Sequence, residues 1–102
     1  MVPGFVLYAS GPRFVVLRRI RQGEAVTIGR SRSADVFVDD PLVSRRHVVV
    51  RAEASSDNVR VCDIGSRNGT RLGDQKIEPN VELSIPFGEQ IKLGRTTIVV
   101  ER

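Results

Sequence analysis

Short apolar runs separated by turn residues recur along the whole chain, and no stretch keeps a 3.6-residue periodicity for longer than one helical turn. Valine and isoleucine together number 23, against 11 for leucine plus alanine, and β-branched residues favour strands. The pattern therefore predicts an all-β fold, a sandwich or barrel of antiparallel strands. The predicted strands are residues 5–9, 13–18, 25–29, 35–38, 47–53, 59–64, 82–85, 90–93 and 96–101.

The 102 residues are enough for one domain with a hydrophobic core. We therefore expect a single domain over 1–102, with its core at about 5–101. The chain could be one module of a longer protein. No apolar stretch approaches the roughly 20 residues of a membrane span, so we expect no membrane insertion. The first ten residues lack the positive n-region of a secretory signal. The single cysteine, Cys62, excludes an internal disulfide framework. Together these features predict a cytoplasmic, reducing location inside the cell.

Two connections are more polar and more basic than a turn requires. The first, residues 29–47, contains a short predicted strand, and the second covers residues 63–75. The loops of a sandwich gather at its two ends, and binding or catalytic residues tend to lie on such loops. These two segments are therefore the place to look for function.

Catalysis is one reading of these loops, because Ser44, His47 and Asp63 are the residue types of a nucleophile, a base and an orienting acid. However, no G-x-S-x-G motif surrounds the serine, and a lone histidine before an apolar run more often fixes a loop. For a metal, one histidine and one cysteine leave only carboxylates, and Asp39 and Asp40 are better explained as turn residues. We predict no enzyme activity, no catalytic residue, no metal and no other cofactor.

Nucleic-acid binding is a second reading, since the formal net charge is +4 and Arg18, Arg19 and Arg21 form a basic run near Arg13. Charged residues on an edge strand also serve to discourage pairing between sheets. Binding of single strands usually adds stacking aromatic rings, and the chain has only four phenylalanines and one tyrosine. We therefore do not expect a nucleic-acid partner.

An anion-binding site is the third reading. Fourteen of the sixteen basic residues are arginine, whose guanidinium fork suits phosphate. A phosphate ester carries about −1.5 to −2 charges at pH 7, and a hydroxyl can bind an oxygen that the fork does not reach. The amide of Asn68 has a donor and an acceptor, as does a peptide backbone, although Asn-Gly is also common in plain hairpin turns. The candidates are Arg30, Ser44, Arg45, Ser66, Arg67 and Asn68.

The segments "IGR" (28–30), "SRRH" (44–47) and "DIGSRNGT" (63–70), followed by Gly73, resemble the signature of the forkhead-associated (FHA) domain. The resemblance covers the chain from about Phe5 to Glu101. It implies a β-sandwich of about eleven mostly antiparallel strands whose loops at one end bind phosphothreonine in a partner protein, such as a kinase or a kinase substrate, during signalling. An alternative is a module of the same fold that acts without phosphate, through other protein contacts or self-association.

Carried over position by position, the resemblance implies that Arg30 and Ser44 contact the phosphate and that Arg45 adds a contact to the same group. Asn68 would bond the peptide main chain next to the phosphothreonine. The implied phosphopeptide-binding set is Arg30, Ser44, Arg45, Ser66, Arg67 and Asn68.

Three further residues are implied to support the site. Gly29 and Gly69 would shape the backbone, and the imidazole of His47 would hold Ser44 in place through a hydrogen bond within the loop. Arg32 and Arg46 lie outside the signature, and we expect them to point to solvent.

Overall fold

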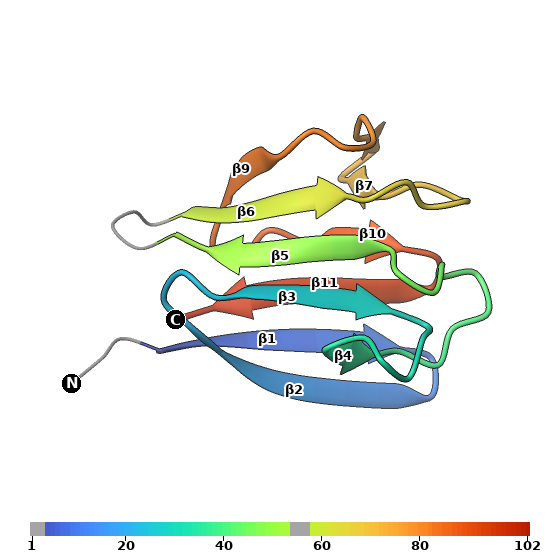
Figure 1. Ribbon diagram of the computed structural model, residues 1–102, viewed down its shortest axis with the longest axis horizontal. Coiled ribbons are helices and arrows are strands. Elements are labelled where there is room, and N and C mark those ends of the chain that lie inside the picture. The colour runs from blue at the N-terminus through green and yellow to red at the C-terminus, as the bar shows by residue number, and fades with distance from the viewer. Residues whose placement is uncertain (1–3, 54–57) are drawn as a thin grey trace.

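The computed structural model describes residues 4–53 and 58–102, and all the regular elements in this part of the chain are strands (Figure 1). Residues 1–3 and 54–57 of the predicted domain lie outside the described residues. The predicted all-β sandwich is confirmed. The strands are β1 (Gly4–Gly11), β2 (Phe14–Arg21), β3 (Ala25–Gly29), β4 (Val36–Phe37), β5 (Val48–Ala52), β6 (Asn58–Asp63), β7 (Arg71–Leu72), β8 (Gln75–Lys76), β9 (Leu83–Pro86), β10 (Ile91–Leu93) and β11 (Thr96–Glu101).

The strands form two sheets that pack face to face. One has the order β2-β1-β11-β10-β7-β8 and the other β4-β3-β5-β6-β9, and β3–β4 is the parallel pair in an otherwise antiparallel set of strand pairs. Burial alternates along the strands, as expected when one face packs on the core and the other meets water. Leu7 and Ile98 of the first sheet and Val26, Val50 and Val61 of the second are fully buried between them.

Four elements differ most from the prediction. β7 and β8 were not predicted, because two residues in a glycine-rich turn are too few to show alternation. β2 continues three residues beyond the predicted end at position 18, because pairing with β1 continues through its arginines as far as Arg21. β4 is shorter than the predicted strand 35–38. No helix that could cross a bilayer occurs in the described part of the chain.

The functional candidates lie at one end of the sandwich. β3 and β6 both run toward this end, drawn on the right in Figure 1, and β5 starts from it. The turn between β10 and β11 is at the same end, since a Cβ at Gly94 would lie 2.8 Å from the Asp40 carboxylate and 2.9 Å from Leu42. Loops distant in sequence therefore meet here.

Candidate functional site

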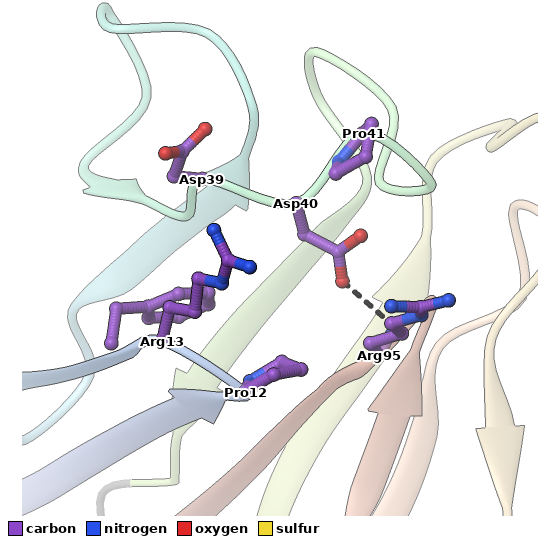
Figure 2. Close-up of a pocket in the computed structure, with 7 residues that line it drawn as sticks. Pro12, Arg13, Asp39, Asp40, Pro41 and Arg95 are labelled. Carbon is purple, nitrogen blue, oxygen red and sulfur yellow. Dashed lines mark hydrogen bonds between the residues drawn. The ribbon is translucent and has the colours of Figure 1, made fainter.

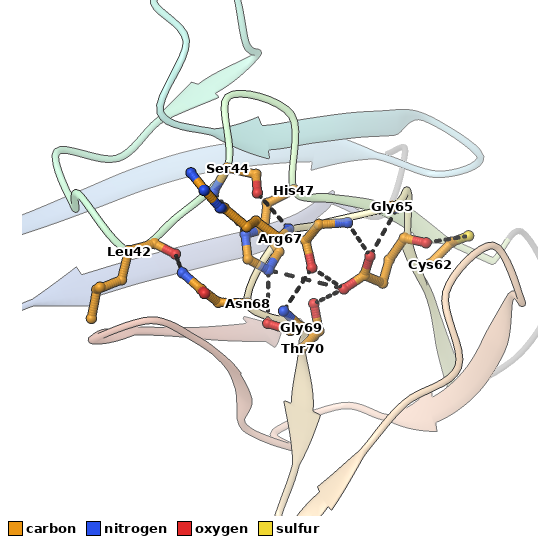
Figure 3. A network of polar contacts seen from close by, with 11 residues as sticks. Leu42, Ser44, His47, Cys62, Gly65, Arg67, Asn68, Gly69 and Thr70 are labelled. Carbon is orange, nitrogen blue, oxygen red and sulfur yellow. Dashed lines mark hydrogen bonds and ion pairs between the residues drawn. The ribbon is translucent and has the colours of Figure 1, made fainter.

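Asp63, the last residue of β6, organises the β6–β7 turn, whose residues Gly65 and Thr70 are labelled in Figure 3. Its Oδ1 accepts hydrogen bonds from the backbone N–H groups of Gly65 (2.9 Å) and Ser66 (2.7 Å). Its Oδ2 accepts from the hydroxyls of Ser66 (2.5 Å) and Thr70 (2.7 Å). Asp63 is 2% exposed and Thr70 is fully buried. Four donors from the same turn therefore satisfy the buried carboxylate in place of water.

The ionised state of Asp63 follows from these contacts. Burial alone raises the pKa of the carboxyl, but the hydrogen bonds from Ser66, Thr70 and Gly65 outweigh it and hold the pKa below the ordinary value of 3.8. The turn is therefore built around a charge that persists at neutral pH. The sequence pattern that signals this arrangement is local, an aspartate followed by serine at i+3.

His47 joins the two candidate loops. Its Nδ1 accepts a hydrogen bond from the backbone N–H of Ser44 (3.0 Å), so its Nε2 must carry the proton that it donates to the carbonyl oxygen of Gly69 (2.9 Å). The ring is fully buried, and burial lowers its pKa below 6.5 although Gly69 and Asp63 act in the opposite direction. A neutral imidazole of fixed tautomer thus ties the β4–β5 loop to the β6–β7 turn.

These contacts do not form a catalytic relay. The His47 ring bonds the backbone of Ser44, not its hydroxyl, and Asp63 Oδ2 is 4.0 Å from Nε2, which already bonds Gly69. The Ser44 hydroxyl instead accepts from the backbone N–H of Arg67 (2.9 Å). Because the hydroxyl acts as acceptor there, its own hydrogen is left for an acceptor outside the loops.

Arg30 is held at its backbone and at Nε. Its backbone N–H donates to Ser44 O (2.9 Å), and its Nε donates to Val43 O (3.1 Å). The side chain is exposed, and no hydrogen bond to a described residue uses the two terminal amino groups of the guanidinium. These two bonds fix the position of Arg30 next to Ser44.

Gly29 is required by a close backbone approach. A Cβ built on it would lie 2.0 Å from the carbonyl oxygen of Arg45, which also accepts a hydrogen bond from Ser31 N–H (3.1 Å). Only glycine lets the β4–β5 loop pass this close to the end of β3. The side chain of Arg45 is exposed, as is that of Arg46.

The β6–β7 turn presents two residues outward and one inward. Arg67 and Asn68 are exposed, and Asn68 Nδ2 donates to the Leu42 carbonyl oxygen (2.9 Å), which connects this turn to the β4–β5 loop (Figure 3). Ser66 is held inside, because its hydroxyl donates to Asp63 and accepts from Gly69 N–H (3.0 Å). The Ser66 hydroxyl thus makes both of these bonds within the turn, and its implied role in binding a phosphopeptide stays a prediction. Gly69 turns the chain at φ 86°.

A second buried carboxylate was missed as a site residue by sequence reasoning. Asp40 is 2% exposed; its Oδ1 accepts from Leu42 N–H (3.0 Å), and its Oδ2 accepts from Arg95 N–H (2.7 Å) and the Thr96 hydroxyl (2.8 Å). Burial raises its pKa, but these hydrogen bonds and the charge of Arg95 outweigh burial and lower it below 3.8. The predicted turn at 39–41 is therefore also fastened to the β10–β11 turn.

An open pocket of about 320 Å³ lies beside Asp40, between the β1–β2 turn and the β4–β5 loop (Figure 2). Guanidinium groups of Arg13 and Arg95 and the carboxylates of Asp39 and Asp40 line it, so its charges balance. In residues 4–53 and 58–102 no cluster of three or more histidine, cysteine, aspartate or glutamate side chains is placed to hold a metal ion.

A family model described as the FHA domain matches residues 26–94. The chain belongs to the FHA domain family. Among curated relatives, the glycogen accumulation regulator GarA of Mycobacterium tuberculosis is 32% identical over 90 residues, which are 88% of this chain and 49% of GarA. This FHA domain thus spans about half of that relative.

Solved structures show the same fold. The FHA domain of the CT664 protein from Chlamydia trachomatis superposes with a TM-score of 0.86 at 22% identity, covering 98% of both chains. A second structure, studied for phosphothreonine-dependent FHA domain interactions, has a TM-score of 0.79 at 26% identity, covering 98% of this chain and 97% of its own. The first supports the fold alone, and the second is an FHA domain with a phosphothreonine-dependent interaction.

Proposed function

We propose that this FHA domain binds phosphothreonine-containing segments of partner proteins through the loops at the end of β3, β5 and β6. The observation that carries the proposal is that the hydrogen bonds joining the two loops leave bonding capacity on three side chains at this end of the sandwich. These are the terminal amino groups of Arg30, the hydroxyl hydrogen of Ser44, and the Oδ1 and second Nδ2 hydrogen of Asn68. We call Arg30, Ser44, Arg45, Arg67 and Asn68 the phosphate clamp.

In the clamp, Arg30 supplies the main charge and Ser44 a neutral donor. A guanidinium can give two parallel hydrogen bonds to phosphate oxygens, and such charge-assisted bonds are roughly twice as strong as neutral ones. The Ser44 hydroxyl then reaches a further oxygen, while Arg45 and Arg67 add positive charge from either loop. Each phosphate oxygen thereby finds a donor.

Asn68 takes the peptide main chain in this proposal. Its Oδ1 and the second hydrogen on Nδ2 remain after the bond to Leu42, which gives one acceptor and one donor for a backbone N–H and C=O. Ser66, held by Asp63, positions Asn68 and does not contact the ligand.

Preorganisation is what makes a small site sufficient. The clamp loops are already joined by His47–Gly69, Asn68–Leu42 and Arg67–Ser44 hydrogen bonds. Binding therefore orders few additional groups, and less of the interaction free energy is lost to conformational entropy. We expect moderate affinity that depends almost entirely on the phosphate.

Calorimetric titration with three peptides of one sequence, carrying phosphothreonine, phosphoserine or plain threonine, tests the proposal. We expect the phosphothreonine peptide to bind and the plain threonine peptide not to bind, while the phosphoserine peptide measures what the threonine methyl group adds. Arg30→Ala should cost about 2–5 kcal/mol of binding free energy, as for truncating one partner of a desolvated charge pair. Arg46→Ala is the matched control, because Arg46 is exposed on the same loop and outside the clamp. Equal binding of phosphorylated and plain peptide would refute the proposal.

The natural partner in this proposal is a kinase or a kinase substrate, and the interaction takes place in the cytoplasm. GarA is a regulator by name, and we extend that regulatory role to this chain as part of the proposal. A phosphopeptide library that varies the positions around the phosphothreonine would define which partners are selected.

A further inference from the structure

The outer face of β2, β1 and β11 carries an apolar patch away from the phosphate clamp. The strand registers place Leu17, Tyr8 and Val99 side by side in one row across the three strands. Leu17 is 62% exposed and Tyr8 38%, and Val15 in the next row is 67% exposed. Three of the five exposed large hydrophobic residues in the described part of the chain therefore lie together on this face.

The patch has clear borders. Beyond β11 the same face becomes basic, because Lys92 of β10 pairs with Thr97 and Arg71 of β7 pairs with Lys92, and both cations are exposed. On the other side β2 is the edge of the sheet. The apolar patch is thus three strands wide, and β1 is its middle strand.

Residues of opposite charge lie at one end of the patch, in the row that contains Val6. Val6 of β1 lies between Arg19 of β2 and Glu101 of β11, and both charged side chains are exposed. Neither forms a salt bridge with any residue that the structure describes. A cation on one outer strand and an anion on the other give the face a charge pattern that complements itself.

We infer that this face binds a second copy of the same domain around a two-fold axis that runs along β1. Rotation by 180° about that axis exchanges β2 with β11 and keeps every row in place. Arg19 of each copy then lies opposite Glu101 of the other copy, and Leu17 of each copy lies opposite Val99 of the other. Tyr8 of one copy contacts Tyr8 of the other. A two-fold interface requires such a self-complementary patch, and aligned sheets pack face to face in this way.

Pairing through the free edge of β2 is a different arrangement that the structure disfavours. Arg18 points toward the core side of this strand and is tied to Glu24 (3.0 Å) and to the Asp35 carbonyl oxygen (3.4 Å). An inward-pointing charge on an edge strand is one of the devices that block edge-to-edge pairing. Association through the face leaves these contacts intact.

The strength of the association follows from the size of the patch. Five residues along each of three strands cover roughly 17 × 14 Å, about 240 Å² per copy, well below the ~800 Å² per partner of a standard interface. An interface this small is typical of weak or transient association, so we expect the pair to form only at high local concentration. It acts when domains are concentrated on one partner or in one assembly.

The direction of the two-fold axis decides where the two phosphate clamps of a pair lie, a consequence that rests on the proposed function. A rotation about an axis parallel to the strands does not reverse their direction, so both clamps lie at the same end of the pair. Two phosphothreonines on one partner can then be bound at once, and weak pairing is enough to raise the apparent affinity through effective concentration.

Sedimentation equilibrium of the domain without any phosphopeptide, at about 0.02–2 mM protein, tests the pairing independently of ligand binding. We expect the mass to rise toward a dimer, with about tenfold weaker association for Arg19→Glu or Glu101→Arg, and recovery in the double variant. Recovery requires the two positions to face each other. A monomer at every concentration, or a double variant no better than the single ones, would overturn the inference.

A peptide with two phosphothreonines tests the orientation. At protein concentrations near the dimerisation constant, we expect it to bind at least tenfold more tightly than the singly phosphorylated peptide, and Leu17→Ser to remove this gain while leaving single-site binding unchanged. A dimer without any gain would place the clamps at opposite ends and overturn the proposed axis. If no phosphopeptide binds while self-association persists, the clamp proposal fails and the pairing stands.

Discussion

The two buried aspartates at the loop end, Asp40 and Asp63, both accept hydrogen bonds that hold loops in place. Their donors come from different parts of the sequence. Each is 2% exposed, and each has a pKa lowered by hydrogen bonds that outweigh the effect of burial. All four donors to Asp63 come from residues 65–70. Asp40 has one local donor, Leu42, and two at Arg95 and Thr96, 55 and 56 residues away.

The difference shows what each carboxylate contributes. Asp63 closes the β6–β7 turn on itself, so this turn carries the information for its own shape in eight consecutive residues. Asp40 does not shape a turn alone; it fastens the β4–β5 loop to the β10–β11 turn, and this link exists only once both sheets have formed. One clamp loop is thus encoded locally and the other depends on the whole sandwich.

Asp63→Ala is expected to have the largest effect. It leaves two backbone N–H groups and two hydroxyls without their acceptor in a buried site, so we expect a loss of about 3–5 kcal/mol in the free energy of unfolding. Binding should be lost as well, since Asn68 sits on this turn. Denaturation by urea measures the stability, with Asp74→Ala on the exposed β7–β8 turn as the control. A loss below about 1 kcal/mol would mean that the turn does not need the carboxylate.

Asp40→Ala is expected to cost less, about 2–4 kcal/mol, because it removes three hydrogen bonds rather than four, and one of them comes from the exposed residue Arg95. Thr96→Val removes only the buried hydroxyl. A double-mutant cycle with these two changes should give a coupling of about 0.5–3 kcal/mol. Additive effects would show that the Asp40–Thr96 hydrogen bond contributes nothing to stability.

The fold could be read from the sequence because alternation and turn residues are local signals. Nine of the strands follow from such runs, but β7 and β8 do not, since two residues cannot show a period. The pairing of β2 beyond position 18 could not be read either, because arginines at alternating positions look like a polar surface until β1 is seen to pair with them.

The contacts of the site also divide into local ones, which the sequence indicates, and long-range ones, which it does not. The Asp63–Ser66 contact spans three residues, and an aspartate followed by serine at i+3 is a local signal that predicts it. The His47–Gly69 bond spans 22 residues and the Asp40–Thr96 bond 56, and nothing local in the sequence indicates either. The roles of Arg30, Ser44 and Asn68 toward a ligand stay predictions until a phosphopeptide is titrated.

The smallest of the three effects is the acid sensitivity of the link between the two loops. His47 is the only histidine of the chain, and its pKa lies below the ordinary value of 6.5 because of burial. The folded state therefore binds fewer protons than the unfolded state, and stability is complete above pH 6.5 and falls as the pH drops below it. Protonation at Nδ1 would also break the bond from Ser44 N–H. The two aspartates contribute nothing in this range, since their lowered pKa values place their loss of stability below pH 3.8.

Thermal unfolding of the ligand-free domain between pH 7.5 and about 5 isolates the histidine, because few other groups titrate in this window. We expect the unfolding free energy of the wild type to fall with pH, and that of His47→Gln to stay flat whatever its value at neutral pH. The slope, not the absolute stability, is the readout, so a general packing defect in the variant does not imitate the result. If both proteins showed the same slope, the imidazole would not be the acid-sensitive link, and the connection between the two loops would rest on the Asn68–Leu42 and Arg67–Ser44 hydrogen bonds.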